Sequence, residues 1–164
     1  MHELRDATMA FFFEAMIQGW VGEGVETELP NLPGYKVFRH ESADKRLVLV
    51  DSYCVSGKSR VPKSVGTTTI WWDDRPVWWM SYGGWYEKEA VPFLKQALLS
   101  VYKVGGFIGG RGPASFRDGH MIYVNRPEKC DFSSFKGHEE IIEIASGSTL
   151  GEHEYWGMSL IHNW

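Results

Sequence analysis

The side chains that most often do chemistry in proteins are present in this chain, but they lack the spacing of a metal or redox motif. His138-Glu139-Glu140 begins like the zinc motif HExxH, yet no second histidine follows four positions on, so two imidazoles cannot lie on one side of a helix. Cys54 and Cys130 are not spaced as a CxxC pair, and we expect free thiols. We therefore predict no metal site and no cofactor.

Acid–base and nucleophilic catalysis also lack a clear motif. No serine stands in a GxSxG elbow. Glu139, Glu140 and Glu143 could supply an acid and a base, but strand alternation places Glu140 on the face opposite the other two. An exposed strand face explains these charges equally well. We predict no catalytic residues, and keep as an alternative an enzyme acting on a small metabolite through Glu139, Arg111 and His162.

The glycine-rich segment 105–112 resembles a phosphate-binding loop in composition only. A phosphate loop leads from a strand into a helix N-terminus, where free N–H groups meet the anion. This segment instead follows a predicted helix and enters a predicted strand. We interpret it as a connector, in which Arg111 could offer a planar fork to a carboxylate or phosphate.

Aromatic residues give the strongest indication of a binding site. Residues 67–82 hold four of the eight tryptophans and predict a β-hairpin closed by residues 73–76, because Thr, Ile, Trp and Val favour strands while Asp and Pro favour turns. With Trp72 opposite Val77, both faces are aromatic. One face would carry Thr68, Ile70, Trp72, Val77, Trp79 and Ser81, and the other Thr67, Thr69, Trp71, Trp78, Met80 and Tyr82.

One of these faces is expected to be covered by helices, and the other to close a pocket or meet a second chain. Stacking on a flat ring, a sugar face or a cation would suit such rings. The predicted ligand-binding residues are Trp71, Trp78, Met80, Tyr82, Arg111, Trp156 and Met158.

Two helices and several strands must position these residues. Apolar spacing predicts helices over residues 4–18 and 89–104. Residues 22–33 are expected to form a loop, since Pro30 and Pro33 stop any continuation. Besides the tryptophan hairpin, strands are predicted over 35–40, 46–55, 121–125, 132–135, 139–145 and 155–162.

The two halves of the sequence match at three places in the same order, which indicates an internal repeat. We therefore predict an α+β fold of two pseudosymmetric repeats, about 4–86 and 89–164, within a single domain of residues 1–164. Each repeat would be a helix followed by antiparallel strands, and the two helices would cover the sheet. A ligand would bind in the groove where the repeats meet.

Composition disfavours nucleic acid and membranes as partners. The 164 residues carry a formal net charge of −4, which is poor for a phosphate-backbone binder. No apolar run is long enough to span a membrane, and the charged start of the chain is unlike a signal peptide. We expect a cytoplasmic protein with no direct nucleic-acid partner.

The order of the segments FFFEAM, VLVDSY, GTTTIWW, PVWWMSYGG, FLKQAL, RGP, IYVN, FKGHEEI and YWGMSLI resembles the bacterial family called domain of unknown function 5680. The resemblance spans nearly the whole chain. Members are standalone proteins or lie behind the helix-turn-helix of XRE-type transcriptional regulators. The resemblance therefore implies an effector-sensing or regulatory role, and implies no known reaction.

Together these observations predict a non-enzymatic module with an aromatic cleft that binds a small, partly flat molecule in a sensing or regulatory role. The alternative from another class is a homodimeric interaction module. In that case the exposed aromatic face and the C-terminal residues 161–164 would form the contact.

Overall fold

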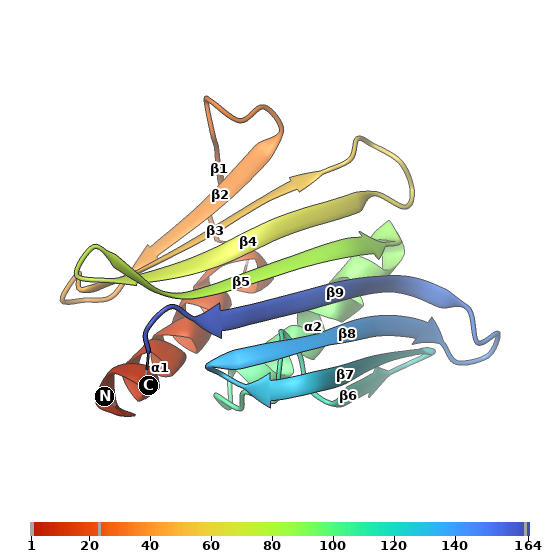
Figure 1. Ribbon diagram of the computed structural model, residues 1–164. Helices are drawn as coiled ribbons and strands as arrows, with labels where there is room; N and C mark the ends of the chain where they lie inside the picture. The colour runs from red at the N-terminus through yellow and green to blue at the C-terminus, as the bar shows by residue number, and fades with distance from the viewer. Residues whose placement is uncertain (1, 23, 163) are drawn as a thin grey trace.

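The computed structural model describes residues 2–22, 24–162 and 164. These residues form one antiparallel sheet of nine strands, with two α-helices packed on one of its faces (Figure 1). The strands follow the order β1-β2-β3-β4-β5-β9-β8-β7-β6 across the sheet. The last strand of the sequence, β9, therefore lies in the middle, between β5 and β8.

The helices are α1 (His2–Gln18) and α2 (Val91–Tyr102), with the short 3₁₀ turns η1 (Trp20–Gly22) and η2 (Lys88–Ala90). The strands are β1 (Thr27–Glu28), β2 (Tyr35–Glu41), β3 (Leu47–Val55), β4 (Lys63–Trp72), β5 (Arg75–Tyr86), β6 (Ser115–Asp118), β7 (Met121–Asp131), β8 (Ser134–Glu143) and β9 (Thr149–Ser159). Both predicted helices and most of the predicted strands are confirmed, with shifted ends.

Two predictions about individual strands are wrong. The expected loop 22–33 contains β1, which pairs with β2 through Thr27 and Val37. The expected strand 132–135 covers the turn between β7 and β8, because Asp131 already pairs with Ser134. Phe132 sits in that turn with its ring buried, so its apolar character reflects the core and not a strand.

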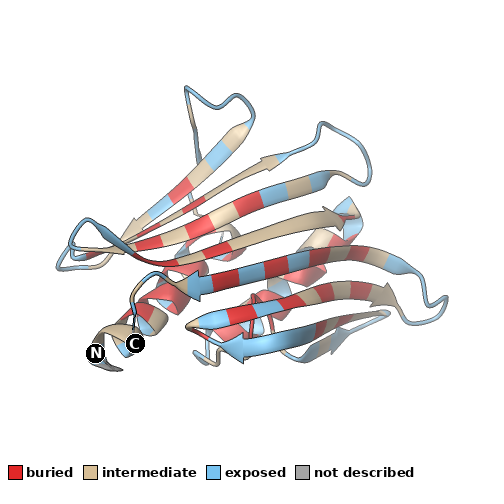
Figure 2. Ribbon diagram, in the orientation of Figure 1, coloured by how far each residue is buried: buried red, intermediate tan, exposed pale blue. Residues whose placement is uncertain are grey.

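Burial alternates along the central strands with a period of two (Figure 2). In β9, His153 and Tyr155 are buried, whereas Glu154 and Trp156 are exposed. Successive side chains of a strand point to opposite faces, so one face of the sheet packs on the helices. We call this the helix-covered face. The opposite, open face has no helix over it within the described part of the chain.

The core lies between the helix-covered face and the two helices. In α2 the buried residues recur at the spacing of one helical face; they are Phe93, Leu94, Ala97, Leu98, Val101 and Tyr102. From α1, Phe12 contributes a fully buried ring that lies 5.1 Å from the ring of Trp78 in β5 and 6.1 Å from that of Tyr102. Both helices therefore share one aromatic core with the sheet.

The tryptophan hairpin is confirmed as β4 and β5, but its predicted register is wrong. Its turn consists of Asp73 and Asp74, both with positive φ (47° and 64°), as in a two-residue type I′ turn. The register then shifts next to Ile70, which pairs with Trp78. Because of this bulge, Trp78 lies on the same face as Ile70, and not on the face predicted for it.

The predicted organisation into two pseudosymmetric repeats is also wrong. The strands form one continuous sheet, in which β5 pairs with β9 from Trp78–Ser159 to Tyr86–Gly151. Five strands precede α2 and four follow it, and the helices contact each other as well as the sheet. Residues 4–86 and 89–164 therefore do not form separate helix-and-strand units.

Within the residues that the structure describes, neither helix combines the length and the apolar character needed to cross a bilayer.

Candidate functional site

A cavity of ≈ 250 Å³ lies between the helix-covered face and the helices. Its apolar side comes mainly from α1, η1 and α2, and includes Met16, Trp20, Val21, Val91, Leu94 and Leu98. Its polar end comes from the sheet and from the connector after α2, and includes Asp51, Ser64, Tyr82, Tyr86, Arg111 and His153. A mostly apolar hollow with a few convergent polar groups is the usual form of a small-molecule site.

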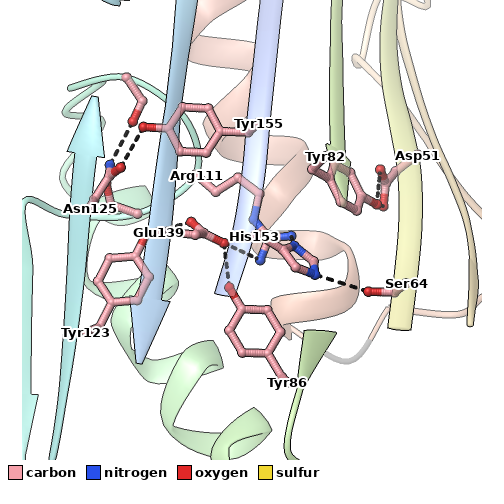
Figure 3. Close-up of polar contacts among 12 residues, drawn as sticks. Asp51, Ser64, Tyr82, Tyr86, Arg111, Tyr123, Asn125, Glu139, His153 and Tyr155 are labelled. Carbon is pink, nitrogen blue, oxygen red and sulfur yellow. Dashed lines mark hydrogen bonds and ion pairs between the residues drawn. The ribbon is translucent and has the colours of Figure 1, made fainter. Parts of the chain in front are cut away.

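Arg111 is the centre of the polar end (Figure 3). Its side chain is buried, with Nη2 3.1 Å from Oε1 of Glu139 and Nη1 3.4 Å from Nδ1 of His153. Its guanidinium also lies 5.0 Å from the ring centre of Tyr82. Burial opposes the charge, but Glu139 and the surrounding tyrosines outweigh it and raise the pKa of Arg111. The guanidinium therefore stays charged.

Glu139, in β8, balances the positive charge of Arg111. Its side chain is fully buried and accepts hydrogen bonds from the hydroxyls of Tyr86 (2.8 Å) and Tyr123 (2.6 Å). Burial raises the pKa of both tyrosines well above the ordinary value, and the negative charge of Glu139 adds to this increase. Both hydroxyls therefore remain protonated donors, so that the carboxylate is held by two hydrogen bonds and one ion pair.

His153 is held in one tautomer. Arg111 has donors only, so Nδ1 of His153 must accept, and the proton of a neutral imidazole then lies on Nε2. Nε2 is 3.1 Å from Oγ of Ser64 and donates to it. Burial and Arg111 lower the pKa of His153 well below the ordinary value, which keeps the ring neutral. The nitrogen facing Ser64 is thus protonated, the reverse of what a serine nucleophile requires from its base.

Asp51 is a second buried carboxyl, and it lines the cavity directly. It accepts hydrogen bonds from Thr68 (2.7 Å) and from the hydroxyl of Tyr82 (2.9 and 3.1 Å to its two oxygens). Burial raises the pKa of Asp51, and these hydrogen bonds and Arg111 only partly oppose the effect. The carboxyl is therefore easier to protonate than an exposed aspartate.

The connector 105–112 places Arg111 by docking onto the sheet. Asn125 in β7 donates from Nδ2 to the carbonyls of Gly109 (2.9 Å) and Gly112 (3.2 Å), and Tyr155 donates to its Oδ1 (2.5 Å). Gly110, with φ of 69°, leaves no room for a side chain, because a Cβ there would lie 2.2 Å from the Tyr155 ring. The segment joins α2 to β6, so its interpretation as a connector is confirmed.

Three donor groups in or beside the cavity remain unsatisfied. Nε and Nη2 of Arg111 and the hydroxyl of Tyr102 are buried and have no hydrogen-bond partner among the described residues. For Nη2, the 3.1 Å approach to Glu139 is an ion pair by distance, but its direction is not that of a hydrogen bond. Buried donors of this kind are rare in native proteins and call for an explanation.

The predicted ligand-binding residues fall in three places. Tyr82 and Arg111 meet in the cavity wall. Trp78 and Met80 are fully buried in the core, where Trp78 donates to the carbonyl of Phe132 (2.9 Å). Strand alternation places the remaining three on the open face; they are Trp71, Trp156 and Met158.

The structure brings together only two of the three residues of the catalytic alternative. Arg111 and Glu139 are in contact, but His162 is exposed beyond the end of β9, and the histidine beside Arg111 is His153. Of the C-terminal contact residues, Asn163 lies outside the described part of the chain. Among the described residues, no three His, Cys, Asp or Glu side chains are grouped so that they could hold a metal ion.

Four residues of the cavity wall are not among the residues predicted from the sequence to bind a ligand: Asp51, Tyr86, Tyr102 and His153. A usable signal was present in β3, where Leu47, Leu49 and Asp51 share one phase of the alternation. An acid in phase with buried leucines indicates a buried polar site.

Comparison with known proteins gives one match. The family model described as "Domain of unknown function (DUF5680)" matches residues 52–160, about two thirds of the chain. The matched range contains Ser64, Tyr82, Arg111 and His153 of the cavity, and Asp51 precedes it directly. No curated protein and no solved structure matches the chain.

Proposed function

We propose that this chain, which belongs to the DUF5680 family, is a small-molecule-binding protein whose ligand occupies the cavity between the helix-covered face and the helices. The observation that carries the proposal is the combination of a ≈ 250 Å³ hollow with a buried, charged Arg111 at one end. A core that served only for packing would be expected to fill such a space with side chains.

The walls suit a ligand that is mostly apolar and partly flat. Trp20, Tyr82, Tyr86 and Tyr102 present aromatic rings, and leucine and valine side chains of α2 complete the apolar side. Offset or edge contacts with these rings favour a flat ligand. The Arg111 network at the polar end would fix the orientation of that ligand.

Binding without catalysis is the reading that the polar groups favour. His153 turns its protonated nitrogen toward Ser64, and Asp51 and Glu139 already accept hydrogen bonds from neighbouring side chains. Ser64 and His153 therefore do not form a nucleophile–base pair. We propose a sensing or regulatory role, in which occupation of the cavity is the signal.

A thermal-shift screen of neutral, naphthalene-sized compounds tests this proposal. A ligand that binds only the native state should raise Tm by roughly 5–10 °C at about one hundred times its Kd. Val91→Phe places a larger ring in the cavity wall and should abolish the shift. Leu99→Phe is the matched control, because Leu99 is also a half-buried residue of α2 but does not line the cavity.

Retention of the full shift in both variants would place the ligand elsewhere and contradict the proposal. Loss of the shift in both would mean that any enlargement of α2 disturbs the fold, and the circular dichroism of the two variants would reveal such a disturbance.

A further inference from the structure

We infer that the ligand is uncharged and presents a hydrogen-bond acceptor of the carbonyl class to Arg111 and Tyr102. This inference rests on the proposed function, because it names the chemical class of ligand for the same cavity.

The residues of the cavity wall carry hydrogen-bond donors that have no acceptor within the described part of the chain. Nε of Arg111 and the Tyr102 hydroxyl both belong to residues that line the cavity, and neither atom has a partner in the described structure. Arg111 and Tyr102 are 7% and 2% exposed. A buried donor without an acceptor is unfavourable, so a bound molecule that supplied an acceptor would be stabilised at this position.

The buried carboxyls near Arg111 already accept hydrogen bonds from protein side chains. Asp51 accepts from Thr68 and Tyr82, and Glu139 accepts from Tyr86 and Tyr123. Ligand donors such as amines would have to compete with these bonds. Ligand acceptors would meet donors that are unused.

The charges around the cavity favour a neutral ligand with an acceptor over an anionic ligand. Glu139 lies 3.1 Å from Arg111 and already balances its charge, Asp51 places a carboxyl in the wall itself, and His153 is neutral. A carboxylate ligand would therefore enter a buried site that has no positive charge left to pair with it. A ketone, aldehyde or amide oxygen accepts hydrogen bonds without adding charge.

Three probes with the same ring test the inference by isothermal titration calorimetry on the full chain. They are 2-acetylnaphthalene, which has a neutral acceptor, 2-isopropenylnaphthalene, which has nearly the same shape and no acceptor, and 2-naphthoate, which is an anion. We expect the ketone to bind about tenfold or more tightly than the hydrocarbon, because its oxygen pairs with a charged donor. The ketone should also bind more tightly than the carboxylate.

Tyr102→Phe tests the contribution of one donor, the Tyr102 hydroxyl. The substitution removes only a hydroxyl that has no partner in the described residues, so the fold should be unaffected, and the advantage of the ketone over the hydrocarbon should fall by about threefold or more. Tyr35→Phe is the control, since it removes a tyrosine hydroxyl from β2, outside the cavity wall. It should leave the ratio of the two affinities unchanged.

The possible failures are distinguishable. Equal binding of ketone and hydrocarbon, or tightest binding of the carboxylate, would overturn this inference while the cavity remained a binding site. An unchanged ketone advantage in Tyr102→Phe would remove Tyr102 from the inference. Failure of all three probes to bind, together with no hit in the wider screen, would overturn the proposed function itself.

Discussion

At the scale of single residues, the raised pKa of Asp51 makes the stability of the protein depend on pH. The Asp51 carboxyl is buried beside Arg111, and burial raises its pKa above the ordinary value. Between the unfolded pKa of about 3.9 and the raised native value, the native state holds a proton that the unfolded state has lost. The contribution of Asp51 to stability therefore falls as the pH rises through this window.

Asp51→Asn should remove this contribution. The amide oxygen can still accept from Thr68 and Tyr82, and no buried charge develops. We predict that the variant is as stable as the native protein near pH 4 and more stable at neutral pH, with urea unfolding at several pH values as the measurement. Lower stability of the variant at neutral pH would show instead that the Asp51 charge is needed beside Arg111.

Asp44→Asn is a control for which the pH dependence of stability should have the opposite sign. The pKa of this exposed aspartate is lowered mainly by a hydrogen bond from Ser42, and also by one from the Arg46 amide. Its charged form therefore stabilises the native state above the unfolded pKa, and the asparagine variant should become less stable relative to the native protein as the pH rises.

Residue types and alternation identified part of the site. The planar fork of Arg111 and the place of Tyr82 in the aromatic hairpin predict a binding role for both residues, and the structure brings both to the cavity wall. His153 could not be selected in this way, because its role comes from Arg111 and Ser64, which lie 42 and 89 residues away in sequence. Pairings at that range leave no local pattern.

At the scale of elements, the turn between β4 and β5 sets the orientation of the tryptophans. Asp73 and Asp74 both have positive φ, and Asp73 pairs with Arg46 through two hydrogen bonds (2.6 and 3.0 Å). Glycine is preferred at the second position of a type I′ turn, because a Cβ is unfavourable there.

Asp74→Gly should therefore stabilise the protein by about 0.5–1 kcal/mol without changing the fold. The paired variant Asp74→Ala keeps the Cβ and loses the local tolerance of aspartate for this conformation, so it should be less stable than the native protein. The midpoint of urea unfolding measures both effects. The same loss of stability in the two variants would mean that the Asp74 side chain has a role of its own.

The elements themselves were predictable, whereas their registers were not. Apolar spacing located α1 and α2, because one face of each helix is buried. In the hairpin, the bulge next to Ile70 inserts one residue and moves Trp78 to the other face. A one-residue shift reverses every later side chain of the strand, and composition does not indicate where it occurs.

At the scale of the whole molecule, the sheet separates two surfaces. The cavity lies on the helix-covered face, and Trp156 is 47% exposed on the open face, with its ring 4.6 Å from that of Trp79. His153 and Trp156 belong to the same strand but point to opposite sides. We therefore predict that Trp156→Gln leaves the ligand-induced rise in Tm unchanged.

Sedimentation of the same variant at low micromolar concentration tests the homodimer alternative. A dimer formed through the open face would dissociate in Trp156→Gln while ligand binding persisted. Loss of the ligand response in a variant that remains folded would show that the two faces are coupled, and would contradict this prediction.

The overall topology was the least predictable feature. The runs LVLVD in β3 and MIYVN in β7 are similar in sequence, as a repeat would require, but both strands lie in a single sheet. Buried strands of one sheet favour the same β-branched and aromatic residues, so such matches arise from a shared environment. Only the pairing of β5 with β9 shows that the halves are continuous.

The central position of β9 has a consequence for synthesis on the ribosome. The first five strands and α2 emerge from the exit tunnel before residues 149–159, yet β5 and β8 have no neighbour on one side until β9 pairs between them. The pairing of β9 with β8 is local, whereas its pairing with β5 joins residues far apart in sequence and is expected to close late in folding. Asp51 and His153 reach the cavity from β3 and β9. A nascent chain whose β9 is still inside the ribosome therefore lacks part of the ligand site. Only a chain whose sheet has been fully translated can form the complete site.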